Sequence, residues 1–144
     1  MRYLLDTNIL SNITKPKPSA SLLTWMAEQI DDDLFIASLT IAEIRRGILE
    51  KPSGKKRAAL KIWFGGKDGP QSLVAGRILP FDEKAALSYG EELMAQGRAT
   101  GRPRSALDTI VATITQSNGC VFVTDNERDF QEIEIINPLR ASTI

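Results

Sequence analysis

The stretch Ser105–Thr124, with the sequence SALDTIVATITQSNGCVFVT, decides the fold of this chain of 144 residues. Its first part carries apolar residues at helical spacing: Leu107, Ile110, Val111 and Ile114. This spacing predicts a helix over Ser105–Asn118, and Gly119 is typical of the position just after a helix. The apolar run that follows predicts a buried strand over Cys120–Thr124. A helix that leads directly into a buried strand indicates an α/β protein.

The rest of the chain repeats this alternation of strands and helices. Further strands are predicted over residues 2–5, 34–37, 77–81 and 134–136, and further helices over residues 19–30, 38–50, 55–64 and 82–96. Loops are predicted over residues 65–70 and 100–103, where glycine and proline gather. The alternation predicts an α/β fold with a parallel, doubly wound sheet, and the length favours one domain over residues 1–144.

Three carboxylates stand where such a sheet would bind a ligand. Asp108 is the only charged residue in Ser105–Asn118, and a buried ionised carboxylate is costly unless a partner compensates it. Asp6 ends an apolar run, and Glu43 lies shortly after the predicted strand 34–37. Ligands of open parallel sheets bind outside the carboxyl ends of the strands. The three acids therefore predict one acidic pocket that binds a divalent cation.

Each of these acids also has a structural interpretation as part of a helix cap. Asp6 would cap the segment after the first strand, and Asp108 would form a loose capping box with Ser105. Glu43 would form a capping box with Thr40, unless the helix begins directly after the strand and leaves Glu43 beyond the first turn. Caps explain each acid by itself but not their common placement near strand ends, which favours the shared pocket.

Two further acids follow the strand over Cys120–Thr124. Asp125 and Asp129 are candidates for a fourth acid in the pocket. A solvated acidic turn is the alternative interpretation of this segment.

The chain has no histidine and one cysteine, which limits its chemistry. Serine–histidine and cysteine–histidine nucleophilic pairs, histidine metal sites and an intramolecular disulfide are all excluded. Cys120 lies in an apolar run and is interpreted as a buried structural thiol. The available metal ligands are oxygen atoms, which favours Mg²⁺ or Mn²⁺.

The sequence gives no sign of a membrane segment or a signal peptide. Its apolar runs all fall short of the roughly 20 residues that a membrane helix needs. The first residues, MRYLLDTN, pass directly from a predicted strand to a polar turn. We therefore expect a cytoplasmic protein that does not contact a membrane.

The formal net charge is zero, but the charges are not evenly mixed. Lys51–Lys67 holds six cations without an acid, among them Lys55, Lys56 and Arg57, and residues 98–104 hold three more. A solvated helix face is one interpretation of such a stretch. Basic segments that flank an acidic pocket also suit a nuclease, because they attract the phosphate backbone of RNA.

Four motifs occur in the order seen in PIN-domain ribonucleases. They are LLDTN at residues 4–8, TIAEI at residues 40–44, the Leu107-Asp108 pair in its apolar helix, and VT-x-N-x-x-DF at residues 123–130. With these motifs the whole chain resembles the VapC and FitB-like toxins of bacterial toxin–antitoxin pairs. No single motif is specific, but four in this order, in a chain of this length, are.

The resemblance implies a fold, an activity and partners. It implies a PIN-like α/β/α sandwich with a central parallel sheet and a Mg²⁺- or Mn²⁺-dependent endoribonuclease that acts on tRNA, rRNA or mRNA. It also implies a homodimer and a DNA-binding antitoxin that inhibits the acidic pocket. The alternative is a PIN-like domain that binds RNA or protein without catalysis.

The resemblance also assigns residues. Asp6, Glu43 and Asp108 match the three core acids, with Asp6 and Asp108 as direct metal ligands and Glu43 as a ligand directly or through water. The fourth acid departs from the family pattern, because Asn126 stands in its place; Asp125 is one position away, and Asp129 matches another recurrent acid of the motif. Supporting and substrate-binding roles fall to Thr7, Asn8, Thr124, Asn126, Lys55, Lys56 and Arg57.

Overall fold

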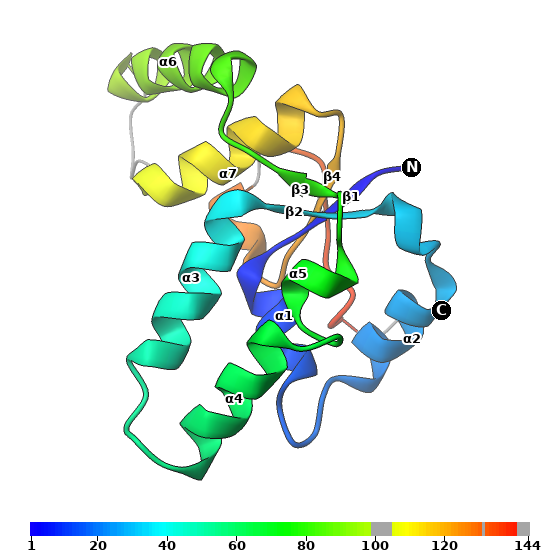
Figure 1. Cartoon of the computed structure of the whole chain (residues 1–144). Coiled ribbons are helices and arrows are strands. Elements are labelled where there is room, and N and C mark those ends of the chain that lie inside the picture. Colours follow the sequence, from blue (N-terminus) through cyan, green and yellow to red (C-terminus); the bar gives the residue numbers. More distant parts are fainter. Residues whose placement is uncertain (99–104, 131, 141–144) are drawn as a thin grey trace.

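A five-stranded parallel sheet forms the centre of the molecule in the computed structural model, which describes residues 1–98, 105–130 and 132–140 (Figure 1). The strands are β1 (Tyr3–Leu5), β2 (Leu34–Ala37), β3 (Ile78–Leu79), β4 (Val121–Val123) and β5 (Ile135–Ile136). Their order in the sheet is β3-β2-β1-β4-β5. The predicted parallel α/β sheet is therefore confirmed.

Strand β1 lies in the middle of the sheet and pairs with two strands at once. Tyr3 is in register with Leu34 of β2 on one side and with Val121 of β4 on the other. Along the chain, β2 and β3 are added on one side of β1, and β4 and β5 are then added on its other side. The order of adding strands thus reverses between β1 and β4. Open α/β sheets form their ligand sites at such a topological switch point.

The helices follow the apolar patterns of the sequence. They are α1 (Thr7–Ile13), α2 (Ala20–Glu28), α3 (Ser38–Leu49), α4 (Lys55–Gly65), α5 (Pro70–Leu73), α6 (Glu83–Arg98) and α7 (Ala106–Ser117). Ser19 and Ser105 cap α2 and α7 with their side chains, and Asp82 accepts a hydrogen bond from the backbone of Ala85 at the start of α6. Gly119 adopts a positive φ of 64° directly after α7, as its predicted position at the helix end requires.

Two hydrophobic cores lie on the two faces of the sheet. Neighbouring residues of a strand point to opposite faces. Leu5 and Ile36 accordingly join the core formed with α1, α2 and α3, whereas Leu4 and Phe122 join the core formed with α7. Helix α6 packs on α7, and α3 and α4 form a hairpin at the other end of the molecule (Figure 1). Both faces are covered, as an α/β/α sandwich requires.

Two expectations from the sequence are wrong in detail. The segment over residues 65–70 is not entirely a loop, because Pro70 begins the short helix α5, where its fixed φ suits a first helical position. Leu107 does not join the apolar stripe of its helix, since 44% of it is exposed. The predicted loop over residues 100–103, together with Arg102 and Arg104, lies outside the described residues.

No helix in the described part of the chain combines the length and the apolarity needed to cross a membrane. Cys120 is buried, as predicted.

Candidate functional site

Asp6 sits directly after β1, where it both caps a helix and points into the site. Its carboxylate accepts hydrogen bonds from the backbone N–H of Thr7 at 2.7 Å and from Nδ2 of Asn8 at 3.2 Å. The hydroxyl of Thr124, at the end of β4, donates a third bond at 2.8 Å. The cap interpretation of Asp6 is therefore confirmed, and three donors from two strand ends fix the orientation of its carboxylate. Its role as a metal ligand stays a prediction.

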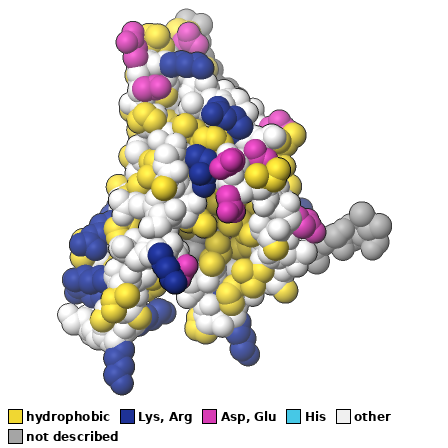
Figure 2. Space-filling model, turned by 45° about the vertical axis from the view of Figure 1, so that its right-hand side comes forward, with side chains coloured by type: hydrophobic (Ala, Val, Ile, Leu, Met, Phe, Trp, Pro, Cys, Tyr) yellow, Lys and Arg dark blue, Asp and Glu magenta, His cyan; other side chains and the backbone are white. Residues whose placement is uncertain are grey.

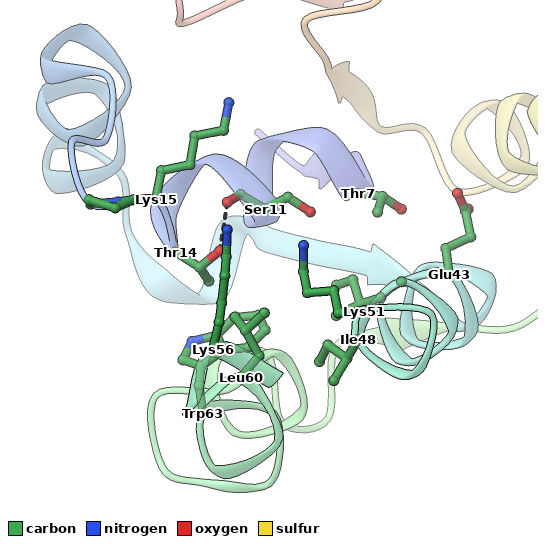
Figure 3. A pocket seen from close by; sticks show the side chains of 13 residues that line it. Thr7, Ser11, Thr14, Lys15, Glu43, Ile48, Lys51, Lys56, Leu60 and Trp63 are labelled. Carbon is green, nitrogen blue, oxygen red and sulfur yellow. Dashed lines mark hydrogen bonds between the residues drawn. The ribbon is translucent and has the colours of Figure 1, made fainter. Parts of the chain in front are cut away.

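Glu43 is not a capping residue. Helix α3 begins at Ser38 with Ala37 as its cap, so Glu43 lies beyond the first turn and no capping box with Thr40 forms. The carboxylate of Glu43 is half-buried, and it lies toward Thr7 of α1 across a pocket between the two helices (Figure 3). Of the two interpretations of Glu43, the structure thus excludes the capping box and places the side chain beside this pocket.

Asp108 occupies the first turn of α7. The hydroxyl of Ser105 accepts a hydrogen bond from the backbone N–H of Asp108 at 3.2 Å, which is the first half of a capping box. The side chain of Asp108 is half-buried on the same side of the helix as the buried Val111, Ala112 and Thr115. Helix α7 therefore holds this carboxylate at the edge of the core.

The three carboxylates act on one another electrostatically. Burial raises the pKa of Asp6, and the charge of Asp108 adds to the rise, while the hydrogen bonds from Thr124, Thr7 and Asn8 oppose it. Burial also raises the pKa of Glu43, with further contributions from Asp6 and Asp108. Among the described residues, none of the three forms an ion pair. Like charges that lack a cationic partner in the described part of the chain favour the binding of a cation.

The same residues have the donor chemistry that Mg²⁺ and Mn²⁺ prefer, namely carboxylate oxygens. The hydroxyl oxygen of Thr7 is buried beside them and makes no hydrogen bond of standard geometry. Its contact with Glu43 opposes the rise in the pKa of that acid and is the smallest of the influences on it. In the described segments, no group of three acidic or thiol side chains lies close enough together to bind a metal ion without a change in conformation. The residues are therefore a set of candidate ligands, not an assembled coordination shell.

Comparison with known proteins assigns the family. The family model of the PIN domain matches residues 3–136, which is nearly the whole chain. The chain belongs to the PIN domain family. The resemblance found in the sequence motifs is thereby confirmed.

Relatives of this PIN domain match it over nearly their full length. A VapC ribonuclease of Sinorhizobium fredii is 34% identical over 137 residues, which cover 94% of this chain and 96% of the relative. The crystal structure of FitAcB from Neisseria gonorrhoeae superposes with a TM-score of 0.86 and 28% identity, over 96% of this chain and 99% of that chain. The structure of FitAB bound to a DNA fragment superposes with a TM-score of 0.85 and 28% identity, over 97% of both chains.

Asp125, one of the two candidates for a fourth acid, lies next to the three acids, but its carboxylate is directed elsewhere. Its backbone N–H donates to Oδ1 of Asn8 at 3.2 Å. Its carboxylate is exposed and accepts a hydrogen bond from Asn137, also at 3.2 Å. The structure therefore brings the backbone of Asp125 to Asn8, while its carboxylate lies against Asn137.

Asn126 joins the site through the same hydroxyl that orients Asp6. Its backbone N–H donates to Oγ1 of Thr124 at 2.9 Å, and its side-chain amide donates to Oδ2 of Asp129 at 2.9 Å. Thr124 is fully buried, so its hydroxyl links the strand end, the following turn and the first acid of the PIN domain.

The basic residues of α4 divide between two hollows of the PIN domain. Lys56 lines a pocket of about 370 Å³ that also contains Thr7 and Glu43. Arg57 lines a second, shallower hollow on another side of the helix, and Lys55 lines neither of them. Lys51, from the same basic stretch, lines the first pocket too. Lys15 also lines it, and sequence reasoning did not single it out, because it lies far from that stretch in the sequence.

Proposed function

We propose that this chain is a metal-dependent endoribonuclease and the toxin of a toxin–antitoxin pair. The observation that carries the proposal is that Asp6, Glu43 and Asp108 lie near one another and have no ion-pair partner among the described residues. They lie near the point between β1 and β4 where the order of adding strands to the sheet reverses. Such a site suits the hydrolysis of phosphodiesters, which needs convergent carboxylates. Relatives named as VapC ribonucleases and as FitB toxins support the same activity.

In this proposal Asp6 and Asp108 hold Mg²⁺ or Mn²⁺ directly, and Glu43 holds it directly or through a water. The bound ion would supply positive charge against the scissile phosphate and its leaving oxygen. The chain has no histidine, so a carboxylate must take the proton of the attacking water. Glu43 suits this role because burial and the neighbouring acids raise its pKa, which makes its ionised carboxylate a stronger proton acceptor.

The remaining predicted residues orient the parts of the site or the substrate. Asn8 and Thr124 hold Asp6 in place through hydrogen bonds. The buried hydroxyl of Thr7 faces the pocket and would donate to a water or to a phosphate oxygen. Asn126 fixes the turn after β4, and a catalytic role for Asp125 stays a prediction.

The basic stretch on α4 would attract the RNA backbone. Lys and Arg side chains are prominent at the lower end of the face in Figure 2, the end at which the hairpin of α3 and α4 lies in Figure 1, while acidic side chains gather nearer its centre. Lys55, Lys56 and Arg57 would steer RNA toward the acids by charge and not by reading bases. The substrate would be a tRNA, rRNA or mRNA.

An antitoxin would inhibit this site by placing a cationic side chain against it. The structural neighbours that are FitAB complexes support such a partner, one of them bound to DNA. An arginine or lysine of the partner would approach Asp6 or Asp108 and take the place of the metal ion. A homodimer is part of the same proposal and is tested by the mass of the protein in solution.

Cleavage of a mixed tRNA and rRNA pool tests the proposal. The purified protein is incubated with Mg²⁺, with Mn²⁺ or with EDTA, beside Asp108→Asn purified in the same way. Discrete fragments that need metal and are absent with the variant support the ribonuclease. Absence of cleavage by a folded, metal-bound protein contradicts it, and equal cleavage by the variant attributes the fragments to a contaminating nuclease.

A further inference from the structure

Of the three acids, Glu43 lines a pocket that extends away from Asp6 and Asp108. It lies between α1, α3 and α4 and has a volume of about 370 Å³ (Figure 3). Thr7 and Glu43 line one part of it, so it is continuous with the proposed catalytic site. A volume of this size holds more than a scissile phosphate, so the far part is available to a neighbouring part of the substrate.

The far part of the pocket is cationic. Lys15 follows α1, Lys51 follows α3 and Lys56 lies on α4, and all three line the pocket. Figure 3 shows the side chains of Lys51 and Lys56 extending toward α1 across the pocket. None of the three forms an ion pair with any residue that the structure describes. The ammonium groups of Lys51 and Lys56, which have no ion-pair partner among the described residues, suit a ligand with negative charge.

An aromatic ring completes the pocket. Lys56, Leu60 and Trp63 lie at i, i+4 and i+7 on one side of α4 and all face the pocket. Trp63 is half-buried and packs against the core on the α1 face of the sheet, which fixes its ring while part of it lines the pocket. An indole held in this way offers a flat surface for a base to stack on.

We infer that this pocket binds an unpaired nucleotide next to the cleaved bond, with Lys51 and Lys56 on its flanking phosphates and Trp63 against its base. The inference rests on the proposed ribonuclease function and adds to it a pocket, with named residues, for the nucleotide beside the cleaved bond. Bases in a duplex are stacked on their neighbours and cannot reach a side chain in this way, whereas bases of loops and ends can.

Fluorescence of Trp63 tests the inference in the metal-free protein, without any cleavage. A Trp25→Phe background leaves Trp63 as the single tryptophan. A short single-stranded oligoribonucleotide is titrated in EDTA, and then the same strand annealed to its complement. We expect the single strand to quench the emission of Trp63 and the duplex to leave it unchanged. Absence of quenching by the single strand, or equal quenching by the duplex, overturns the inference.

Charge variants test the phosphate contacts by fluorescence anisotropy. Each of Lys51→Ala and Lys56→Ala should reduce the salt dependence of log K by about 0.7 per lost phosphate contact. Lys17→Ala removes the same charge from an exposed position outside the pocket and should leave the slope unchanged. A slope reduced equally by all three variants would mean diffuse attraction and would contradict a phosphate site.

Two substitutions of Trp63 test the stacking. Trp63→Leu should weaken binding of the single strand by about 5- to 150-fold, the range measured for loss of one stacked base. Trp63→Phe keeps an aromatic face and should retain most of the affinity; urea unfolding checks that both variants are folded. Affinity unchanged in folded Trp63→Leu overturns the stacking.

The cleavage assay separates this inference from the proposed function. RNA cleaved in a metal-dependent way by the wild-type protein, but equally well by Lys51→Ala, Lys56→Ala and Trp63→Leu, would leave the ribonuclease in place and overturn the nucleotide pocket. RNA that binds with quenching of Trp63 but is never cleaved would support the pocket and contradict the ribonuclease.

Discussion

The hydroxyl of Thr124 donates a hydrogen bond of 2.8 Å to the carboxylate of Asp6, across 118 positions of sequence. Thr124 follows β4 and Asp6 follows β1, and these strands are neighbours in the sheet. The bond therefore spans the topological switch point of the sheet. The backbone N–H of Asp6 reinforces the link by donating to the carbonyl of Val123 at 2.9 Å. The strand pairing thus fixes the first acid of the site.

Thr124→Val tests this link. The substitution keeps the shape of the side chain, but Asp6 loses a donor, and the backbone N–H of Asn126 loses its acceptor. Leaving buried polar groups unsatisfied costs about 1–3 kcal/mol, so we expect the free energy of unfolding in urea to fall by that amount. Cleavage should fall too, because the hydroxyl no longer orients Asp6. Thr124→Ser, which keeps the hydroxyl, is the control, and equal losses in both variants would contradict the role of the bond.

The raised pKa values of Asp6 and Glu43 predict how stability depends on pH in EDTA. Their pKa values are higher in the folded than in the unfolded chain, so the folded state binds more protons between those values. Stability from these groups is therefore fully present below the ordinary carboxyl pKa of about 4 and is lost as the pH rises through the folded values. The comparison is made by urea unfolding at each pH, with Asp6→Asn as the reference.

Asp6→Asn removes one titrating group, so the free energy of unfolding should fall less steeply with pH than in the wild-type protein. Identical slopes would mean that the Asp6 carboxyl is not perturbed by burial and by Asp108.

Much of the site could be predicted from the sequence, for local reasons. Asp6 follows, and Glu43 lies shortly after, an apolar run that is typical of a buried strand, and Asp108 is a lone charge in an apolar helix. The start of α3 at Ser38 then follows from the strand ending at Ala37, and it frees Glu43 from the cap. The position of a residue could therefore be predicted from the sequence where it depends on a single helix or strand.

Features that depend on several elements could not be predicted. Thr124 contacts Asp6 only because β4 pairs with β1. The local pattern of apolar residues does not determine the order of strands in the sheet. Lys15 and Lys51 face the pocket of Glu43 only because α1, α3 and α4 converge. Asp125 was predicted from its position alone, but the adjoining turn directs its carboxylate to Asn137.

Metal binding should stabilise the fold measurably. A ligand at about 100 times its dissociation constant stabilises the native state by about 2.7 kcal/mol, which corresponds to a rise in Tm of several degrees for a domain of this size. We expect this rise for the wild-type protein with Mg²⁺ or Mn²⁺, measured by thermal unfolding. Asp108→Asn should show little of it and should melt higher than the wild type in EDTA, because one repelling charge is gone.

Asp68→Asn is the matched control for that experiment, because Asp68 is an exposed acid in the loop before α5. Its response to metal should equal that of the wild-type protein. A rise in Tm that persists in Asp108→Asn would place the ion elsewhere.

Ser105→Ala tests whether the helix cap positions Asp108. Loss of a serine cap costs about 1 kcal/mol of stability, and it loosens the first turn of α7, which carries Asp108. We expect a lower free energy of unfolding and slower cleavage. Ser105→Asn supplies another good cap and should restore both quantities. Cleavage that is unaffected in Ser105→Ala would show that the cap has no part in placing the acid.

The most direct test of the central claim is Mn²⁺ binding, followed by the electron paramagnetic resonance signal of the free ion. The wild-type protein is compared with Asp6→Asn, Glu43→Gln and Asp108→Asn, each checked for folding, and with Asp68→Asn as control. If the three carboxylates form one site, each of the three variants binds Mn²⁺ much more weakly, and the control binds it as the wild-type protein does. Undiminished binding by all three variants would contradict a shared site.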